Sequence, residues 1–219
     1  MSQTILYLLL EASAATLFMV FAASFIATLL GLPLGVLLYM TRPNAIAEHR
    51  RLHQALALLV NITRSIPFII LMIAVIPFTR FVVGTSIGTI AAIVPLSLAA
   101  IPFVARVVES AILETPSGLI DAAIAMGATH WQIVRKILLP ESLGGIINGM
   151  TLTVVNLVGY SAMAGAVGGG GLGDLAIRYG YQRFDISIML ITIFIMVIMV
   201  QTIQFSGEYL AKRVTHVKY

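Results

Sequence analysis

The stretch that decides the fold runs from Thr115 to Glu141 and reads TPSGLIDAAIAMGATHWQIVRKILLPE. The sequence on either side of it is mostly apolar. Thr115 and Pro116 form a helix start signal, with Thr115 as the N-cap and Pro116 at the first helical position. Gly127 is placed to end this helix, because glycine readily accepts the left-handed backbone that follows a helix. One short helix with both ends marked is therefore predicted.

A second helix is predicted directly after the first. Thr129 and Gln132 are three residues apart, which is the spacing of a capping box. Pro140 is expected to stop this second helix, because proline lacks the backbone N–H that a helix needs. Asp121 lies in the first turn and a half of the first helix, where the helix dipole tolerates a carboxylate. The stretch 115–140 thus predicts two short helices with a bend between them.

The spacing of this stretch resembles the EAA loop of ABC-importer permeases, the binding-protein-dependent importers. The matching anchors are Asp121-Ala122-Ala123, Gly127 after three residues, and Ile137-Leu138-Leu139-Pro140 after nine more. Asp121 stands where this family usually has Glu. The resemblance implies a coupling helix that docks into a groove on a separate ATPase subunit. It assigns ATPase coupling to Asp121, Ala122, Ala123, Gly127, Ala128, Thr129, Trp131, Gln132 and Pro140. Without the resemblance, the residues would also fit an amphipathic interfacial hairpin.

The composition predicts a membrane protein. Of the 219 residues, 59% are hydrophobic and 10% are charged, whereas an average globular chain is about 25% charged. In a membrane protein, a net charge of +4 usually reflects the orientation in the membrane and contact with lipid headgroups, and not the binding of nucleic acid. The absence of cysteine excludes disulfides, thiolate metal sites and a cysteine nucleophile. The first ten residues contain no Lys or Arg, so no cleavable signal peptide is expected.

Four long runs contain no charged residue, and a fifth is interrupted only by Arg64. Each is long enough for a transmembrane helix, since about 20 apolar residues cross the hydrocarbon core. We predict an all-α membrane protein whose residues 1–219 form a single permease domain. Its five transmembrane helices are approximately 12–41, 54–79, 81–105, 142–167 and 186–210. Small residues four apart predict close helix contacts at Gly31/Gly35, Gly84/Gly88, Gly145/Gly149 and Gly165/Gly169.

The positions of Lys and Arg predict the orientation of these helices. Ten lie on one predicted side: Arg42, Arg50, Arg51, Arg64, Arg106, Arg135, Lys136, Lys212, Arg213 and Lys218. Three lie on the other: Arg80, Arg178 and Arg183. The positive-inside rule therefore places the C-terminus and the stretch 115–140 in the cytoplasm and the N-terminus outside.

Polar residues of the fourth predicted span form one stripe. At about 100° per residue, Asn148, Asn156, Tyr160 and Met163 fall within an arc of roughly 120°. Amides within a span usually face a helix interface or a water-lined cavity. The stripe predicts the translocation pathway and its gate, with packing between helices as the alternative.

Two further segments carry family resemblances. Arg64-Ser65-Ile66-Pro67 resembles the Arg-x-x-Pro segment of amino-acid-importing ABC permeases, and Arg64 is interpreted first as an interface anchor and second as a dimer or gating residue. Residues 173–184 resemble the corresponding part of methionine-import permeases. The preceding glycines, 168–173, match a dinucleotide fingerprint only formally, because no strand precedes them. A flexible outer turn is expected there instead.

The sequence thus predicts the permease subunit of an ATP-driven importer for methionine or a related amino acid. The expected partners are a second copy, two ATP-binding cassette subunits, an extracytoplasmic binding protein and membrane lipid, with no nucleic acid. ATP and magnesium belong on the partner ATPase, because the chain lacks a phosphate-binding loop and no catalytic constellation is present. The expected location is the bacterial cytoplasmic (inner) membrane. The alternative is a self-sufficient secondary transporter or channel, which would be expected to carry acids within its spans. A pathway without fixed charge is also expected, which suits a zwitterion.

Overall fold

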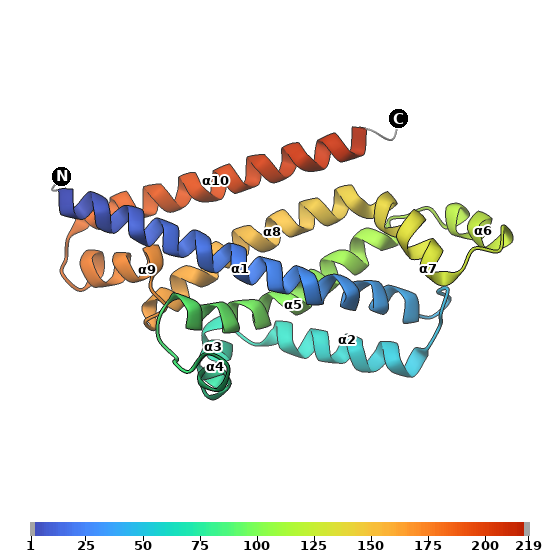
Figure 1. Cartoon of the computed structure of the whole chain (residues 1–219), viewed down its shortest axis with the longest axis horizontal. Coiled ribbons are helices and arrows are strands. Elements are labelled where there is room, and N and C mark those ends of the chain that lie inside the picture. The colour runs from blue at the N-terminus through green and yellow to red at the C-terminus, as the bar shows by residue number, and fades with distance from the viewer. Residues whose placement is uncertain (1–2, 217–219) are drawn as a thin grey trace.

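The computed structural model describes residues 3–216, and no strand occurs in that range. The predicted domain continues to both termini, so residues 1–2 and 217–219, including Lys218 of the charge count, lie outside the described residues. Long helices run roughly along the longest axis of the molecule (Figure 1). Four are long and apolar enough to span a membrane. They are α1 (Gln3–Thr41), α5 (Thr89–Leu113), the continuous helix His130–Ala166 and α10 (Ile186–His216).

The predicted span 54–79 is a broken one. Helix α2 (Arg50–Ser65) and helix α3 (Phe68–Ala74) meet at an angle of 102°, and α4 (Ile76–Val83) follows. The break is at Ile66 and Pro67, where Ile66 is extended with ψ 124°. The helical region is disfavoured for a residue before proline, because the residue clashes with the proline ring. Counting α2 and α3 as one span, the structure has up to five.

Two helices differ in their bounds from the spans predicted for them. Helix α5 begins at Thr89 and ends at Leu113, eight residues later than the predicted 81–105. Helix α1 begins by Gln3 rather than at residue 12, so Glu11 lies inside it. Both differences arose because charged residues were taken as span ends. In α5, Arg106 and Glu109 pair at 2.6 Å, which lowers the cost of keeping both within the helix.

The core centres on the contact between α1 and α5. A Cβ added to Gly31 would come within 2.7 Å of Val104 Cβ, and one added to Gly35 within 2.7 Å of Val108 Cβ. Val104 and Val108 are fully buried. Glycine is therefore required for these backbones to approach, as the spacing of small residues predicted. The same prediction is wrong for residues 84 and 88, which lie in a loop where an added Cβ meets nothing within 4 Å.

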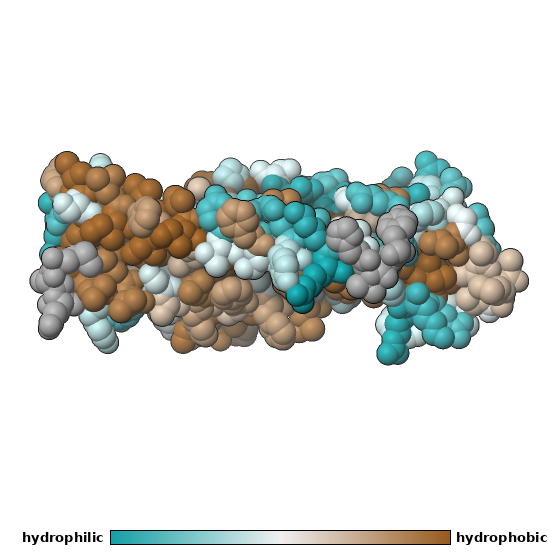
Figure 2. All heavy atoms as spheres, turned by 90° about the horizontal axis from the view of Figure 1, so that it is seen from above, coloured by the Kyte–Doolittle hydropathy of each residue, from teal (hydrophilic) through white to brown (hydrophobic). Residues whose placement is uncertain are grey.

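The two ends of the molecule carry different segments. The start of α1 and the helix α9 (Gly171–Leu175) lie at one end, whereas the 42–49 connection, the α6–α7 region and the end of α10 lie toward the other (Figure 1). This is the grouping that the charge count predicts. Figure 2 shows brown, hydrophobic residues dominating the half of the surface that holds the N-terminus. Large apolar side chains are exposed there and along the helices, among them Phe21, Phe25, Phe81 and Phe194. A surface of this kind suits lipid contact.

Candidate functional site

The predicted bend at Gly127 is confirmed. Helix α6 spans Ser117–Ala125, and Gly127 follows it with φ +76°. The Ala128 N–H donates to the Ala123 carbonyl at 3.0 Å, and the Gly127 N–H donates to the Ile124 carbonyl at 2.9 Å. These two bonds form the Schellman motif, which requires a left-handed residue where Gly127 stands.

The predicted start of α7 (His130–Ile133) is also confirmed. The Gln132 N–H donates to Thr129 Oγ1 at 3.4 Å, and the Thr129 N–H donates to Gln132 Oε1 at 2.8 Å, which completes the capping box. The predicted start of α6 is wrong by one residue, because Pro116 and not Thr115 is the N-cap. Thr115 is buried, and its hydroxyl oxygen has no hydrogen-bond partner within residues 3–216.

The prediction that Pro140 stops the second helix is wrong. Helix α7 passes into the π-helical segment η1 (Val134–Leu138) and then into α8 (Leu139–Ala166). A π-helical turn changes the backbone pairing locally, so the missing N–H and the ring of Pro140 are accommodated without ending the helix. The stretch 115–140 is therefore one short helix, a bend and the beginning of a helix that continues to Ala166.

The bend presents an apolar surface at the end of the molecule. Three side chains, which we call the α6–α7 surface, are strongly exposed: Ile124 at 51%, Met126 at 80% and Trp131 at 69%. Of these three, Trp131 is a predicted coupling residue, and the remaining predicted coupling residues that are exposed are Asp121, Ala122, Gly127, Thr129, Gln132 and Pro140. Ala123 is buried and Ala128 is half-buried. Ile124 and Met126 were not singled out from the sequence, because an isolated apolar residue is equally consistent with core packing.

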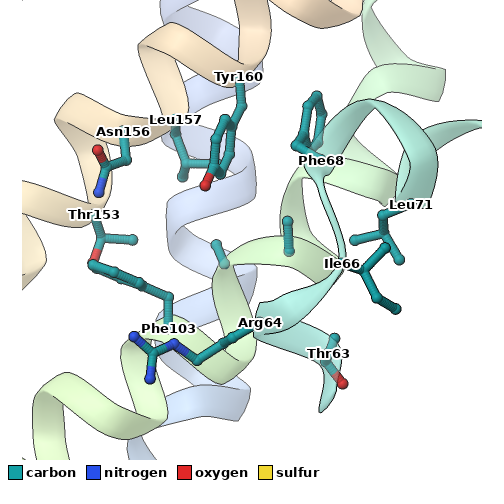
Figure 3. Close-up of a pocket in the computed structure, with 12 residues that line it drawn as sticks. Thr63, Arg64, Ile66, Phe68, Leu71, Phe103, Thr153, Asn156, Leu157 and Tyr160 are labelled. Carbon is teal, nitrogen blue, oxygen red and sulfur yellow. The ribbon is translucent and has the colours of Figure 1, made fainter. Parts of the chain in front are cut away.

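A pocket of ≈ 220 Å³ lies where α2 and α3 meet α5 and α8 (Figure 3). Its lining includes three residues predicted from the sequence: Arg64, Asn156 and Tyr160. It is completed by Thr63, Ile66, Phe68, Leu71, Ala99, Ala100, Phe103, Thr153 and Leu157. The polar stripe of the fourth predicted span therefore does face a cavity over part of its length.

The rest of the stripe lies elsewhere. Asn148 lines a separate pocket of ≈ 570 Å³, together with Glu114 and Glu141. Met163 is 48% exposed and lines neither of these two pockets. A stripe on one helix face covers several turns, so its members meet different neighbours along the helix axis.

Aromatic rings form much of the pocket. The rings of Phe68 and Tyr160 stack with centroids 4.7 Å apart. The guanidinium carbon of Arg64 lies 5.6 Å from the centroid of the Phe103 ring, which is a cation–π arrangement. Arg64 lies in the last turn of α2, where a cation also complements the helix dipole. This pocket therefore contains a fixed charge, whereas the pathway was expected from the sequence to contain none.

No pattern in the sequence pointed to the pocket residues contributed by α3 and α5. Phe68 reaches the pocket only because the chain turns by 102° before α3. Phe103 lies in α5, which was predicted eight residues too early in the sequence. The neighbours of its side chain could therefore not be assigned. Both residues line the pocket because segments that are distant in the sequence meet there, and helical periodicity does not predict such contacts.

The glycine-rich segment 168–173 is packed rather than free. It leads into α9 and the π-helical segment η2 (Ala176–Tyr181). The Leu172 N–H donates to Thr16 Oγ1 at 2.9 Å, and the Gly88 N–H donates to the Gly168 carbonyl at 2.9 Å. Gly171, Leu172, Gly173 and Leu175 are buried. The expected flexible turn is thus a short helix fixed against α1 and the loop before α5.

Comparison with known proteins gives one consistent family. Residues 31–216 match the model for the binding-protein-dependent transport system inner membrane component. A probable D-methionine transport system permease protein, MetI, of Vibrio cholerae is 56% identical over 209 residues, which cover 95% of this chain and 93% of the relative. The D-methionine transport system permease protein MetI of Escherichia coli K12 is 56% identical over 165 residues, covering 75% and 76%.

Solved structures agree with this match. A chain from inward facing conformations of the MetNI methionine ABC transporter superposes with a TM-score of 0.96 at 52% identity, covering 98% of this chain and 99% of that one. An amino acid ABC transporter crystallised with histidines shares the fold alone, with a TM-score of 0.76 at 19% identity and 94% of each chain covered. The chain described here belongs to the family of binding-protein-dependent transport system inner membrane components.

Proposed function

We propose that this chain is the membrane-spanning subunit of an ATP-driven importer for methionine. Two copies would form the translocation pathway in the bacterial cytoplasmic membrane. Two separate ATPase subunits would bind ATP and magnesium, and an extracytoplasmic binding protein would deliver the substrate. The observation that carries this proposal is the superposition on the MetNI methionine transporter over 98% of the chain at 52% identity.

The α6–α7 surface is the proposed docking site for the ATPase. Its apolar side chains are exposed at the end of the molecule. The bend that carries them is held by backbone hydrogen bonds at Gly127 and by the capping box at Thr129. Helix α7 continues without a loop to Ala166, and the same helix carries Asn156 and Tyr160 at the pocket. A displacement of α7 by the ATPase would therefore reach the pocket through one continuous helix. This supports the coupling role for the residues assigned from the EAA resemblance.

The orientation follows from the charge distribution. The end that carries the α6–α7 surface also holds the 42–49 connection and the C-terminus, and most Lys and Arg residues belong to that half of the predicted topology. The positive-inside rule places this end in the cytoplasm, where ATP is available.

The second copy is proposed from the exposed face of α8. Asn148, Leu152, Asn156 and Met163 are exposed along it, at spacings of four, four and seven residues. An amide facing lipid would be costly, so this face should meet protein or water in the assembled transporter. A second copy related by a two-fold axis would cover the same face of both chains.

Growth on methionine tests the proposal. A methionine auxotroph without its own methionine uptake systems would receive this chain with its ATPase and binding protein. We expect growth on low concentrations of D- or L-methionine, and no growth when this chain is omitted. Growth that is the same with and without the chain would refute the proposed function.

A further inference from the structure

We propose that the 220 Å³ pocket is a binding site for the amino acid within the membrane, and that Arg64 binds its α-carboxylate. The inference rests on the proposed function and adds a site and a chemical role to it. Figure 3 shows the Arg64 side chain extending toward Phe103, with Asn156 and Tyr160 across the pocket from them.

The guanidinium of Arg64 has no carboxylate partner among residues 3–216. The two ion pairs in that range join Arg106 to Glu109 and Arg178 to Asp174. An arginine in an apolar span is costly unless it is paired or hydrated, so such a residue usually marks a substrate pathway. Its planar fork of donors matches a carboxylate in a bidentate geometry.

Arg106 provides an internal contrast. It is close to Arg64 in the structure, since both line an adjoining cavity of ≈ 350 Å³. However, Arg106 Nη1 donates to Glu109 at 2.6 Å and its Nη2 donates to Asn61 Oδ1 at 2.9 Å. The charge of Arg106 is therefore already neutralised within the protein. Of these two arginines, Arg64 remains available to an anionic group, since no ion pair in residues 3–216 joins it to Glu114, whose carboxylate also lines the adjoining cavity.

The remaining walls suit an apolar side chain. Phe68, Tyr160 and Phe103 provide aromatic faces, and Leu71 and Leu157 provide aliphatic ones. A thioether makes favourable contacts with aromatic rings, which fits methionine. The Asn156 amide offers a neutral acceptor for the ammonium group. At ≈ 220 Å³ the pocket lies below the range of drug-sized sites, about 300–1,000 Å³, so it suits one amino acid rather than a peptide.

Binding to the purified permease–ATPase complex tests this site. The complex is placed in lipid nanodiscs without the binding protein, and equilibrium binding of radiolabelled L-methionine is measured. Competition by methioninamide, in which a neutral amide replaces the carboxylate, isolates the carboxylate contact. The variants are Arg64→Gln and Arg64→Lys. The matched control is Arg42→Gln, because the Arg42 guanidinium also lies over an aromatic ring, 5.2 Å from the Tyr39 centroid, but does not line the pocket.

We expect the unsubstituted complex to bind methionine at least about tenfold more tightly than methioninamide, which is the scale of one hydrogen-bonded charge contact. Arg64→Gln should bind methionine about tenfold or more weakly and should lose the preference. Arg64→Lys should retain part of it, and Arg42→Gln should behave as the unsubstituted complex does.

An unsubstituted complex that binds both compounds equally, or an Arg64→Gln complex that keeps the preference, would overturn the inference. The first comparison needs no substitution, so it decides the question even where Arg64→Gln fails to assemble. A complex that takes up methionine without binding it at this site refutes this inference alone. A complex that takes up no methionine refutes the proposed function itself.

Discussion

The rings of Phe68 and Tyr160 stack nearly parallel, with an interplanar angle of 4° and centroids 4.7 Å apart. The contact joins α3 to α8 beside the bend of the broken helix pair. It links the short helix that follows Pro67 to the long helix that begins at the α6–α7 bend. The angle of α3 is therefore connected to the position of α8.

Removing this stack should loosen the contact between α3 and α8. An aromatic pair contributes about 0.5–1.5 kcal/mol beyond its buried area. Tyr160→Leu should therefore lower the midpoint of thermal unfolding in detergent, whereas Tyr160→Phe should leave it nearly unchanged. A double-mutant cycle with Phe68→Leu measures the coupling. A coupling energy of zero would show that the two rings contribute independently.

Arg106 should stabilise the fold by compensating the buried carboxylate of Glu109 in α5. Glu109 is buried, and its ion pair with Arg106 measures 2.6 Å. Breaking a buried pair by removing one partner costs about 3–5 kcal/mol, because it leaves an uncompensated charge. We expect Arg106→Leu to reduce thermal stability strongly. The double variant Arg106→Leu with Glu109→Leu should recover most of the loss, and a double variant no more stable than Arg106→Leu would contradict this explanation.

The absence of cysteine allows the orientation to be mapped directly. Single cysteines at Asn44 and Met126 should react with an impermeant maleimide only from the cytoplasmic side. A cysteine at Thr85, an exposed residue of the loop before α5, should react only from outside. The prediction follows from the positions of Lys and Arg. Labelling of positions 44 and 85 from the same side would remove the model of an odd number of spans.

Gly127→Val should uncouple transport from ATP hydrolysis. An added Cβ would meet no atom within 4 Å, so the cost comes from the backbone, where φ is +76°. A β-branched residue is strained there by about 1–3 kcal/mol. We expect normal membrane levels but weak retention of the ATPase and loss of ATP-dependent uptake.

Gly84→Val is the matched control for that substitution. Gly84 has φ +81° and equally open surroundings, but it lies in the loop before α5 and not in the coupling stretch. It should cause similar strain and leave ATPase retention intact. Equal loss of retention in both variants would indicate a general folding defect and would argue against a hinge at Gly127.

The elements predicted correctly from the sequence are those whose ends are determined by hydrogen bonds between neighbouring residues. The Gly127 bend and the Thr129–Gln132 capping box are set by hydrogen bonds within a few residues, and both were found as predicted. The predicted spans 142–167 and 186–210 stay predictions, and each coincides largely with a long apolar helix, His130–Ala166 and α10, because long uncharged helices need little tertiary information.

The failures share a different physical cause. The Pro67 break and the passage of the helix through Pro140 both depend on how prolines are accommodated by their surroundings. The displaced bounds of α5 depend on the pairing of Arg106 with Glu109. The pocket combines residues from four helices, so the partners of Arg64 and Asn156 could be known only from the three-dimensional contacts.

The most direct test of the account is methionine uptake by the purified complex in proteoliposomes. The chain, its ATPase and its binding protein are reconstituted, and uptake of radiolabelled methionine is followed with ATP, with a non-hydrolysable ATP analogue, and with a proton or sodium gradient alone. We predict accumulation only with hydrolysable ATP, because the chain depends on its partner for energy. Accumulation driven by an ion gradient without ATP would contradict the account and would identify a self-sufficient secondary transporter.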